Sequence, residues 1–164
     1  MKFSVVVPEV EELEQGPPEE VAVENARRKA MSVARGHADA LVLGVDTVVA
    51  LGVRLYGKPA DERDARDTLE ALSGRRHRVI SGLCLIDGDR ARTVATITEV
   101  EFRTLDGQLL NWYLAGGEWR ERAGGYAVQG RGAALVARIE GDYQNVVGLP
   151  LAALLELAPD LLTA

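Results

Sequence analysis

The chain has little cysteine, histidine and lysine, and it lacks any long hydrophobic run. Its single cysteine, Cys84, excludes an intrachain disulfide, and its apolar neighbours at 83–86 favour a buried side chain over a nucleophile. The sequence has no Cys-x-x-Cys and no pair of histidines at helical spacing, so we expect no zinc site. No apolar run approaches the roughly 18 residues that a membrane span needs. Residues 1–10 lack the pattern of a secretory signal, so we expect a cytoplasmic protein.

The charge balance is acidic. Nineteen Lys and Arg face 25 Asp and Glu, a formal charge of −6. This disfavours a general surface for nucleic acid or for an anionic membrane. The cations are mostly arginines, and the three lysines are Lys2, Lys29 and Lys58. Lysine is a compact point charge that binds phosphate well, so a small anionic ligand held by a few placed cations stays compatible with the composition.

The pattern of apolar residues predicts an α/β fold in one mixed-sheet domain that spans residues 1–164, with antiparallel pairs as well as crossovers. The expected strands are 2–8, 41–51, 55–56, 79–86, 92–102, 126–128 and 133–139. The expected helices are 20–35, 61–72, 105–114 and 150–157. A chain of this length can bury a sizeable core.

Asp46 lies in the middle of the apolar run 41–51, LVLGVDTVVAL. A continuous run of this kind suits a strand buried on both faces. An ionised carboxylate is costly to bury unless it meets a cation, a metal or hydrogen-bond donors. Asp46 is therefore either a satisfied structural residue or the acidic centre of a site.

Four polar residues at strand ends or in loops are candidates for chemistry, namely Glu12, Asp46, Lys58 and Gln129. Two carboxylates could hold a hard divalent cation, a lysine could neutralise phosphate oxygens, and Asp46 could act as general base. Neither a Walker pattern nor a Gly-x-Ser-x-Gly elbow is present. His77, between arginines, is predicted to lie in a solvated basic turn, with phosphate contact as the alternative. The glycine-rich tract 124–130 either approaches a ligand through its backbone or forms only a turn.

Short segments along nearly the whole chain form a pattern with one order, namely 7–12, 26–30, 43–49, 57–59, 72–74 with 77–79, 123–130 and 141–150. Together these segments resemble the Maf family of nucleoside triphosphate pyrophosphatases, which are related in fold to the inosine triphosphate pyrophosphatases. The resemblance implies hydrolysis of a nucleoside triphosphate to the monophosphate and pyrophosphate, with a divalent metal, Mg or Mn, as cofactor. It also implies a homodimer and, for some members, a link to septum formation.

The same resemblance assigns roles to individual residues. Asp46 matches the family's proton acceptor, and it would share the metal with Glu12. Thr47 and Gln129 match positions tied to substrate choice, and they resemble the dTTP/UTP branch. The other charged positions of the family's active site match Glu12, Lys29 and Lys58.

The start of the chain departs from the family. The expected N-terminal strand and the Ser-x-Ser-Pro-Arg-Arg phosphate loop, which would precede Phe3, are absent from residues 1–164. This leaves an alternative function open, a catalytically weak nucleotide-binding or septum-formation regulatory protein on the same scaffold. Hydrolysis of modified purine nucleotides is a further alternative that differs only in substrate.

Overall fold

The computed structural model describes residues 3–162. Within them the strands are β1 (Val42–Leu51), β2 (Arg54–Tyr56), β3 (Arg76–Asp87), β4 (Arg90–Phe102) and β5 (Val136–Glu140). The α-helices are α1 (Pro18–Ala34), α2 (Glu62–Leu72), α3 (Gly107–Ala115), α4 (Tyr143–Val147) and α5 (Leu151–Leu157). Three short 3₁₀ segments, η1 (Ala123–Gly125), η2 (Arg131–Leu135) and η3 (Pro159–Leu162), complete the described elements.

The strands form one sheet in the order β2-β1-β3-β4-β5, and each neighbouring pair is antiparallel. The predicted α/β class with a single sheet is confirmed. Strand β1 pairs with β3 along almost its whole length, but it pairs with β2 only over residues 49–51. Among the described residues, the stretch 42–48 of β1 therefore has a strand partner on one side only, which leaves its other edge open.

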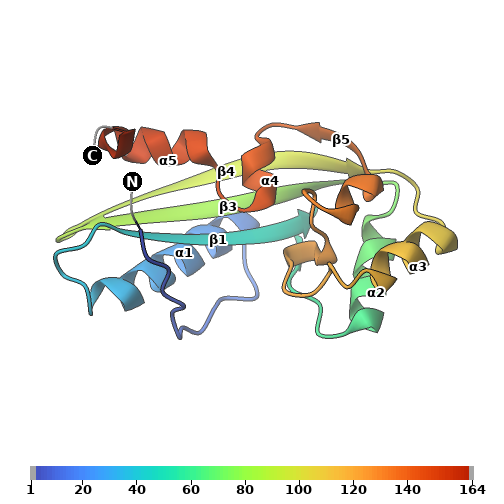
Figure 1. Ribbon diagram of the computed structural model, residues 1–164, viewed down its shortest axis with the longest axis horizontal. Helices are drawn as coiled ribbons and strands as arrows, with labels where there is room; N and C mark the ends of the chain where they lie inside the picture. Colours follow the sequence, from blue (N-terminus) through green and yellow to red (C-terminus); the bar gives the residue numbers. More distant parts are fainter. Residues whose placement is uncertain (1–2, 163–164) are drawn as a thin grey trace.

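Helix α1 covers one face of the sheet, and α4 and α5 lie on the other (Figure 1). Side chains alternate between the two faces of a strand. Val42 and the paired strand's Cys84 and Ile86 pack against Ala26 and Ala30 of α1. The neighbouring Asp46 and Thr47 consequently point to opposite faces, Asp46 toward α1 and Thr47 toward α4.

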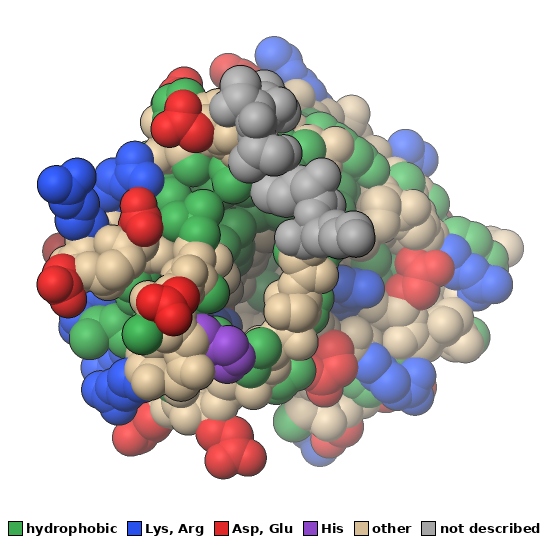
Figure 2. Space-filling view, turned by 60° about the vertical axis from the view of Figure 1, so that its left-hand side comes forward, with side chains coloured by type: hydrophobic (Ala, Val, Ile, Leu, Met, Phe, Trp, Pro, Cys, Tyr) green, Lys and Arg blue, Asp and Glu red, His purple; other side chains and the backbone are tan. Residues whose placement is uncertain are grey.

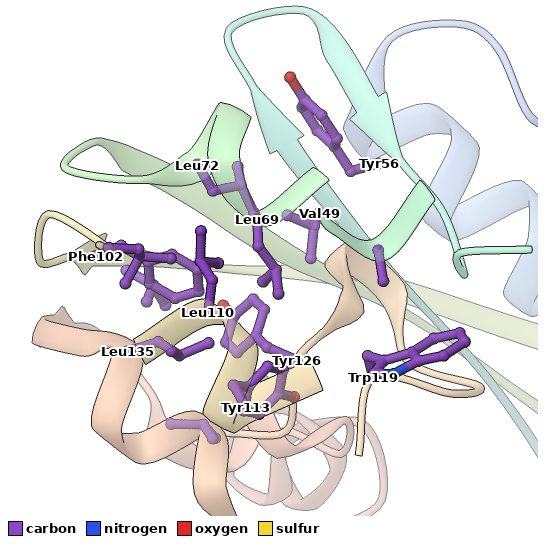
Figure 3. Packing of buried hydrophobic residues seen from close by; sticks show 14 of the residues in the cluster. Val49, Tyr56, Leu69, Leu72, Phe102, Leu110, Tyr113, Trp119, Tyr126 and Leu135 are labelled. Atoms are coloured by element: carbon purple, nitrogen blue, oxygen red, sulfur yellow. The ribbon is translucent and has the colours of Figure 1, made fainter. Parts of the chain in front are cut away.

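The larger hydrophobic core lies at the end of the sheet that α2 and α3 cover (Figures 1 and 3). Phe102, Leu110, Tyr113 and Tyr126 come together there from β4, α3 and the loop before η2 (Figure 3). Full burial of a side chain of this size contributes roughly 1.5–3 kcal/mol to stability. This core fixes the far end of β1 and the loop that faces it.

Two glycines let α1 approach the sheet closely. A Cβ atom on Gly82 of β3 would run into the carbonyl of Ala22, and one on Gly44 of β1 would meet the backbone of Ala26 and Ala30. The helix backbone therefore lies directly on the backbone of the two strands. This contact fixes the height of the α1 side chains above β1.

Two of the expected strands are wrong. Residues 3–8 form no strand, and the side chains of Phe3, Val5 and Val7 are 80%, 81% and 86% exposed, while Lys2 lies outside the described residues. An apolar segment becomes a strand only where a neighbouring strand forms hydrogen bonds with its backbone N–H and C=O groups. Residues 126–128 are also not a strand, because positive φ angles at Gly124 and Gly125 turn the chain just before them.

None of the helices in residues 3–162 is both long enough and apolar enough to span a membrane.

We expect Gly82→Ala to lower the free energy of unfolding by about 1–3 kcal/mol, because the new methyl group forces α1 away from β3. Gly107→Ala at the start of α3 is the matched control, since nothing lies within 4 Å of its Cβ position. Urea denaturation of both variants tests this. A Gly82→Ala variant as stable as Gly107→Ala would contradict the close contact.

Candidate functional site

Two hollows meet at the open edge of β1. The α4-side hollow, of about 260 Å³, is lined by Thr47, Tyr126 and Gln129 and reaches Lys29. The α1-side hollow, of about 480 Å³, is lined by side chains that include Glu12, Asn25 and Tyr56. Both hollows share Asp46, Thr47, Lys58 and Ala123. All six residues singled out by the sequence, Glu12, Lys29, Asp46, Thr47, Lys58 and Gln129, therefore line one or both hollows.

A cluster of three charges occupies the junction. The Lys29 Nζ atom lies 2.6 Å from Asp46 Oδ1 and 2.9 Å from Glu12 Oε1. The Asp46 side chain is 8% exposed, so its charge depends on these partners. Burial lowers the pKa of Lys29, but hydrogen bonds and charge from Asp46 and Glu12 outweigh burial and raise it above its usual value. One ammonium group thus draws two carboxylates to a common point.

Asn25 links this cluster to the segment that carries Glu12. Its Oδ1 accepts the Leu13 N–H at 2.7 Å, and its Nδ2 donates to the Leu13 carbonyl at 3.1 Å and to Asp46 Oδ2 at 3.2 Å. The side chain is 2% exposed, and both its oxygen and its amide protons are used. Asn25 therefore fixes the backbone beside Glu12 and orients the second oxygen of Asp46.

Lys58 lies at the mouth of both hollows. Its Nζ atom is 3.5 Å from Glu121 Oε2, and the two side chains are 60% and 86% exposed. An ion pair this exposed contributes little to stability, so Lys58 remains available to an anionic ligand. Gly124 donates its N–H to the Gly57 carbonyl at 3.0 Å, which ties the loop 121–129 to the segment of Lys58.

The α4-side hollow presents a hydroxyl and an amide. Thr47 is half-buried, and its Oγ1 atom lies 2.8 Å from Ser81 Oγ. Gln129 is exposed and makes no hydrogen bond to another of the described residues, so its amide is free to donate and to accept. Such a pair suits a flat polar ring with both donors and acceptors along one edge.

His77 lies neither in a solvated turn nor beside a phosphate site. It belongs to β3, is 2% exposed, and its Nε2 atom lies 2.9 Å from the hydroxyl oxygen of Tyr126. Burial lowers the pKa of His77 to about 4, and burial also raises the pKa of Tyr126. Both groups are therefore neutral at pH 7. Tyr126, which lines the α4-side hollow, packs in the core (Figure 3) and connects the hollow to His77.

Among residues 3–162, no group of three His, Cys, Asp or Glu side chains is placed to hold a metal ion. The two carboxylates that share Lys29 are therefore the acidic donors at the junction. On the face drawn in Figure 2, basic and acidic side chains are interspersed around hydrophobic surface. Among the described residues, the excess of acidic side chains behind the net charge of −6 therefore forms no separate acidic patch on that face.

Sequence reasoning missed Asn25, Ser81 and Tyr126 as site residues. A signal existed for Asn25, because it lies four positions before Lys29 and so shares a face of α1 with it. No comparable signal existed for Ser81, since it becomes a neighbour of Thr47 only through the register of β1 and β3.

We expect Asn25→Leu to lower the free energy of unfolding by about 1–3 kcal/mol, because the partly buried Leu13 N–H and the buried Asp46 carboxylate each lose a partner. Hydrogen exchange of the Leu13 amide should become faster at the same time. Asn111→Leu is the control, since Asn111 is exposed on α3 and its side chain bonds, within residues 3–162, to Arg66 alone. Unchanged protection of the Leu13 amide in Asn25→Leu would contradict the linking role.

We expect His77 to make stability fall as the pH drops from about 6.5 to 4. Over this range the unfolded chain binds a proton at His77 and the folded chain largely does not. The resulting loss in the free energy of unfolding is about 3 kcal/mol at pH 4. His77→Gln should remove this part of the dependence of stability on pH, whereas His37→Gln, at an exposed site, should not. Denaturation at several pH values measures the free energy of unfolding of each variant. A constant difference in stability between wild type and His77→Gln over the whole range would disprove this assignment.

Comparison with known proteins gives a consistent result. Residues 1–161 match the family described as Maf-like protein. A dTTP/UTP pyrophosphatase of Pyrococcus furiosus is 43% identical over 147 residues, which cover 90% of this chain and 77% of the relative. Proteins of the same name from Deinococcus radiodurans and Clostridioides difficile are each 43% identical, over 94% and 96% of this chain and 80% and 83% of the relatives. The chain belongs to the Maf-like protein family.

Proposed function

We propose that the protein hydrolyses a nucleoside triphosphate, dTTP or UTP, between the α and β phosphates, and releases the monophosphate and pyrophosphate. The observation that carries the proposal is the junction of the two hollows, where a charged cluster around Asp46 adjoins the hydroxyl of Thr47. The names of the curated relatives support it.

The sizes of the hollows support binding of the base in one hollow and of the phosphates in the other. Ligand pockets commonly enclose about 300–1,000 Å³. The α4-side hollow, at about 260 Å³, suits a single ring, and the larger α1-side hollow suits the phosphates. In this arrangement Thr47 and Gln129 face the base. Lys58 lines both hollows, and the Lys29 ammonium lies beside Asp46 at their junction, so both can meet the triphosphate where it joins the nucleoside. Each would make a charge-assisted contact of about 1.5–3 kcal/mol.

A divalent cation, Mg²⁺ or Mn²⁺, fits the carboxylates of Glu12 and Asp46, because both approach the Lys29 ammonium and each keeps lone pairs that Lys29 does not use. Magnesium is usually held by one or two carboxylates together with substrate phosphates and water, which agrees with a donor set of two. When bound, such an ion polarises a phosphorus centre and makes a water molecule more acidic.

Asp46 is the general base in this proposal. A carboxylate offers about four lone-pair sites, and Lys29 and Asn25 occupy one on each oxygen. A remaining site accepts the proton of the water that attacks phosphorus, while the bond to the pyrophosphate oxygen breaks and pyrophosphate leaves. Lys29 and Asn25 hold the carboxylate in place during this step.

Pyrophosphate release tests the proposal directly. With Mg²⁺ or Mn²⁺ present, we expect Asp46→Asn to turn over dTTP at least about a hundredfold more slowly than wild type, because an amide is a far poorer base. Asp39→Asn, at an exposed site outside both hollows, is the matched control.

Retention of activity within about threefold in a folded Asp46→Asn variant would rule out Asp46 as the base. No release from dTTP, UTP, CTP, ATP or GTP by wild type, together with measurable nucleotide binding, would instead support the nucleotide-binding alternative.

A further inference from the structure

Thr47 and Ser81 stand directly opposite each other in the register of β1 and β3, on the face of the sheet that α4 covers. Their hydroxyl oxygens are 2.8 Å apart, and either could be the donor when this pair is considered alone. Ser81 is fully buried, whereas Thr47 lines the α4-side hollow. The direction of this one hydrogen bond therefore decides which hydrogen-bonding group Thr47 offers to a ligand.

The backbone of α4 settles the direction. Ser81 Oγ donates to the carbonyl oxygen of Asn145 at 3.4 Å. A serine hydroxyl has only one proton, so Ser81 must accept from Thr47. Thr47 Oγ1 has no other hydrogen-bond partner within residues 3–162, so the reverse direction would leave its proton without an acceptor in the protein.

The Asn145 carbonyl is held firmly in place. The Asn145 side chain is fully buried, and its Nδ2 donates to the Val79 carbonyl at 3.0 Å and to Thr98 Oγ1 at 2.9 Å. Thr98 Oγ1 in turn donates to the Asp142 carbonyl at 3.0 Å. These bonds fasten α4 to β3 and β4, and they fix the position of the carbonyl that accepts from Ser81.

From this relay we infer that Ser81 is a positioning residue for base selection, because it keeps the proton of Thr47 away from the α4-side hollow and leaves only lone pairs facing the ligand. Thr47 then accepts a hydrogen bond and cannot donate one. The ring N–H of uracil or thymine fits this acceptor, whereas cytosine presents an unprotonated ring nitrogen at the same position. The inference rests on the proposed function, in which this hollow receives the base.

The test compares UTP with CTP. Ser81→Ala removes the acceptor, so the Thr47 hydroxyl can turn, and it can then accept from the ring N–H of uracil or donate to the ring nitrogen of cytosine. We expect the ratio of kcat/KM for UTP to that for CTP to fall by about tenfold, the value of one hydrogen bond of roughly 1.4 kcal/mol. Ser32→Ala on α1, outside both hollows, should leave the ratio unchanged. A ratio measured within one variant does not depend on the fraction of protein that is folded.

Binding of UMP and CMP, measured by calorimetry, separates this inference from the proposed function. If wild type prefers UMP and Ser81→Ala loses the preference, the inference stands even where no pyrophosphate is released. It is overturned if Ser81→Ala keeps the wild-type preference, or if wild type shows no preference for uracil in either hydrolysis or binding.

Discussion

The contact between the backbone of α1 and the backbone of β1 and β3 governs the charged end of the site. Gly44 and Gly82 permit it, because any side chain there would collide with the helix. Asn25 and Lys29 project from this helix, and only at this distance do they reach Asp46 within hydrogen-bonding range. The position of Glu12 depends on the same contact, since Asn25 holds the backbone of the adjoining Leu13.

The open edge of β1 gives the site its two sides. Because β2 pairs only with the end of β1, the middle of the strand is reachable from both faces of the sheet. Adjacent residues on a strand point in opposite directions, so Asp46 and Thr47 supply two different chemistries from neighbouring positions. A nucleotide likewise has two different ends, charged phosphates at one and a hydrogen-bonding ring at the other. The proposed function therefore suits this edge of the sheet.

Rigid neutral groups support the α4 side, whereas balanced charges support the α1 side. On the α4 side, Asn145 and Thr98 fix α4 against the sheet, and the neutral pair His77 and Tyr126 fills the space beneath the hollow. On the α1 side, the Lys29 ammonium offsets the repulsion between two carboxylates. Neutral groups suit the recognition of an uncharged base, and exposed charges such as that of Lys58 suit phosphates.

The sequence by itself determined the α/β class, most of the elements and the candidate role of Asp46, because apolar periodicity and local charge are properties of short segments. The family resemblance added Lys29 and Thr47 to the residues that line the hollows. The sequence wrongly predicted strands at residues 3–8 and 126–128. A strand needs a neighbouring strand to pair with, and the sequence of one short segment does not show whether such a partner exists. Sequence reasoning also misjudged His77, whose burial follows from contacts with Phe102 and Tyr126, far away in the chain. Only the tertiary structure decided that Asn25 bonds to Asp46 and that Ser81 faces Thr47. The sheet register and the helix contact create both pairs, and they join residues 21 and 34 positions apart in the chain.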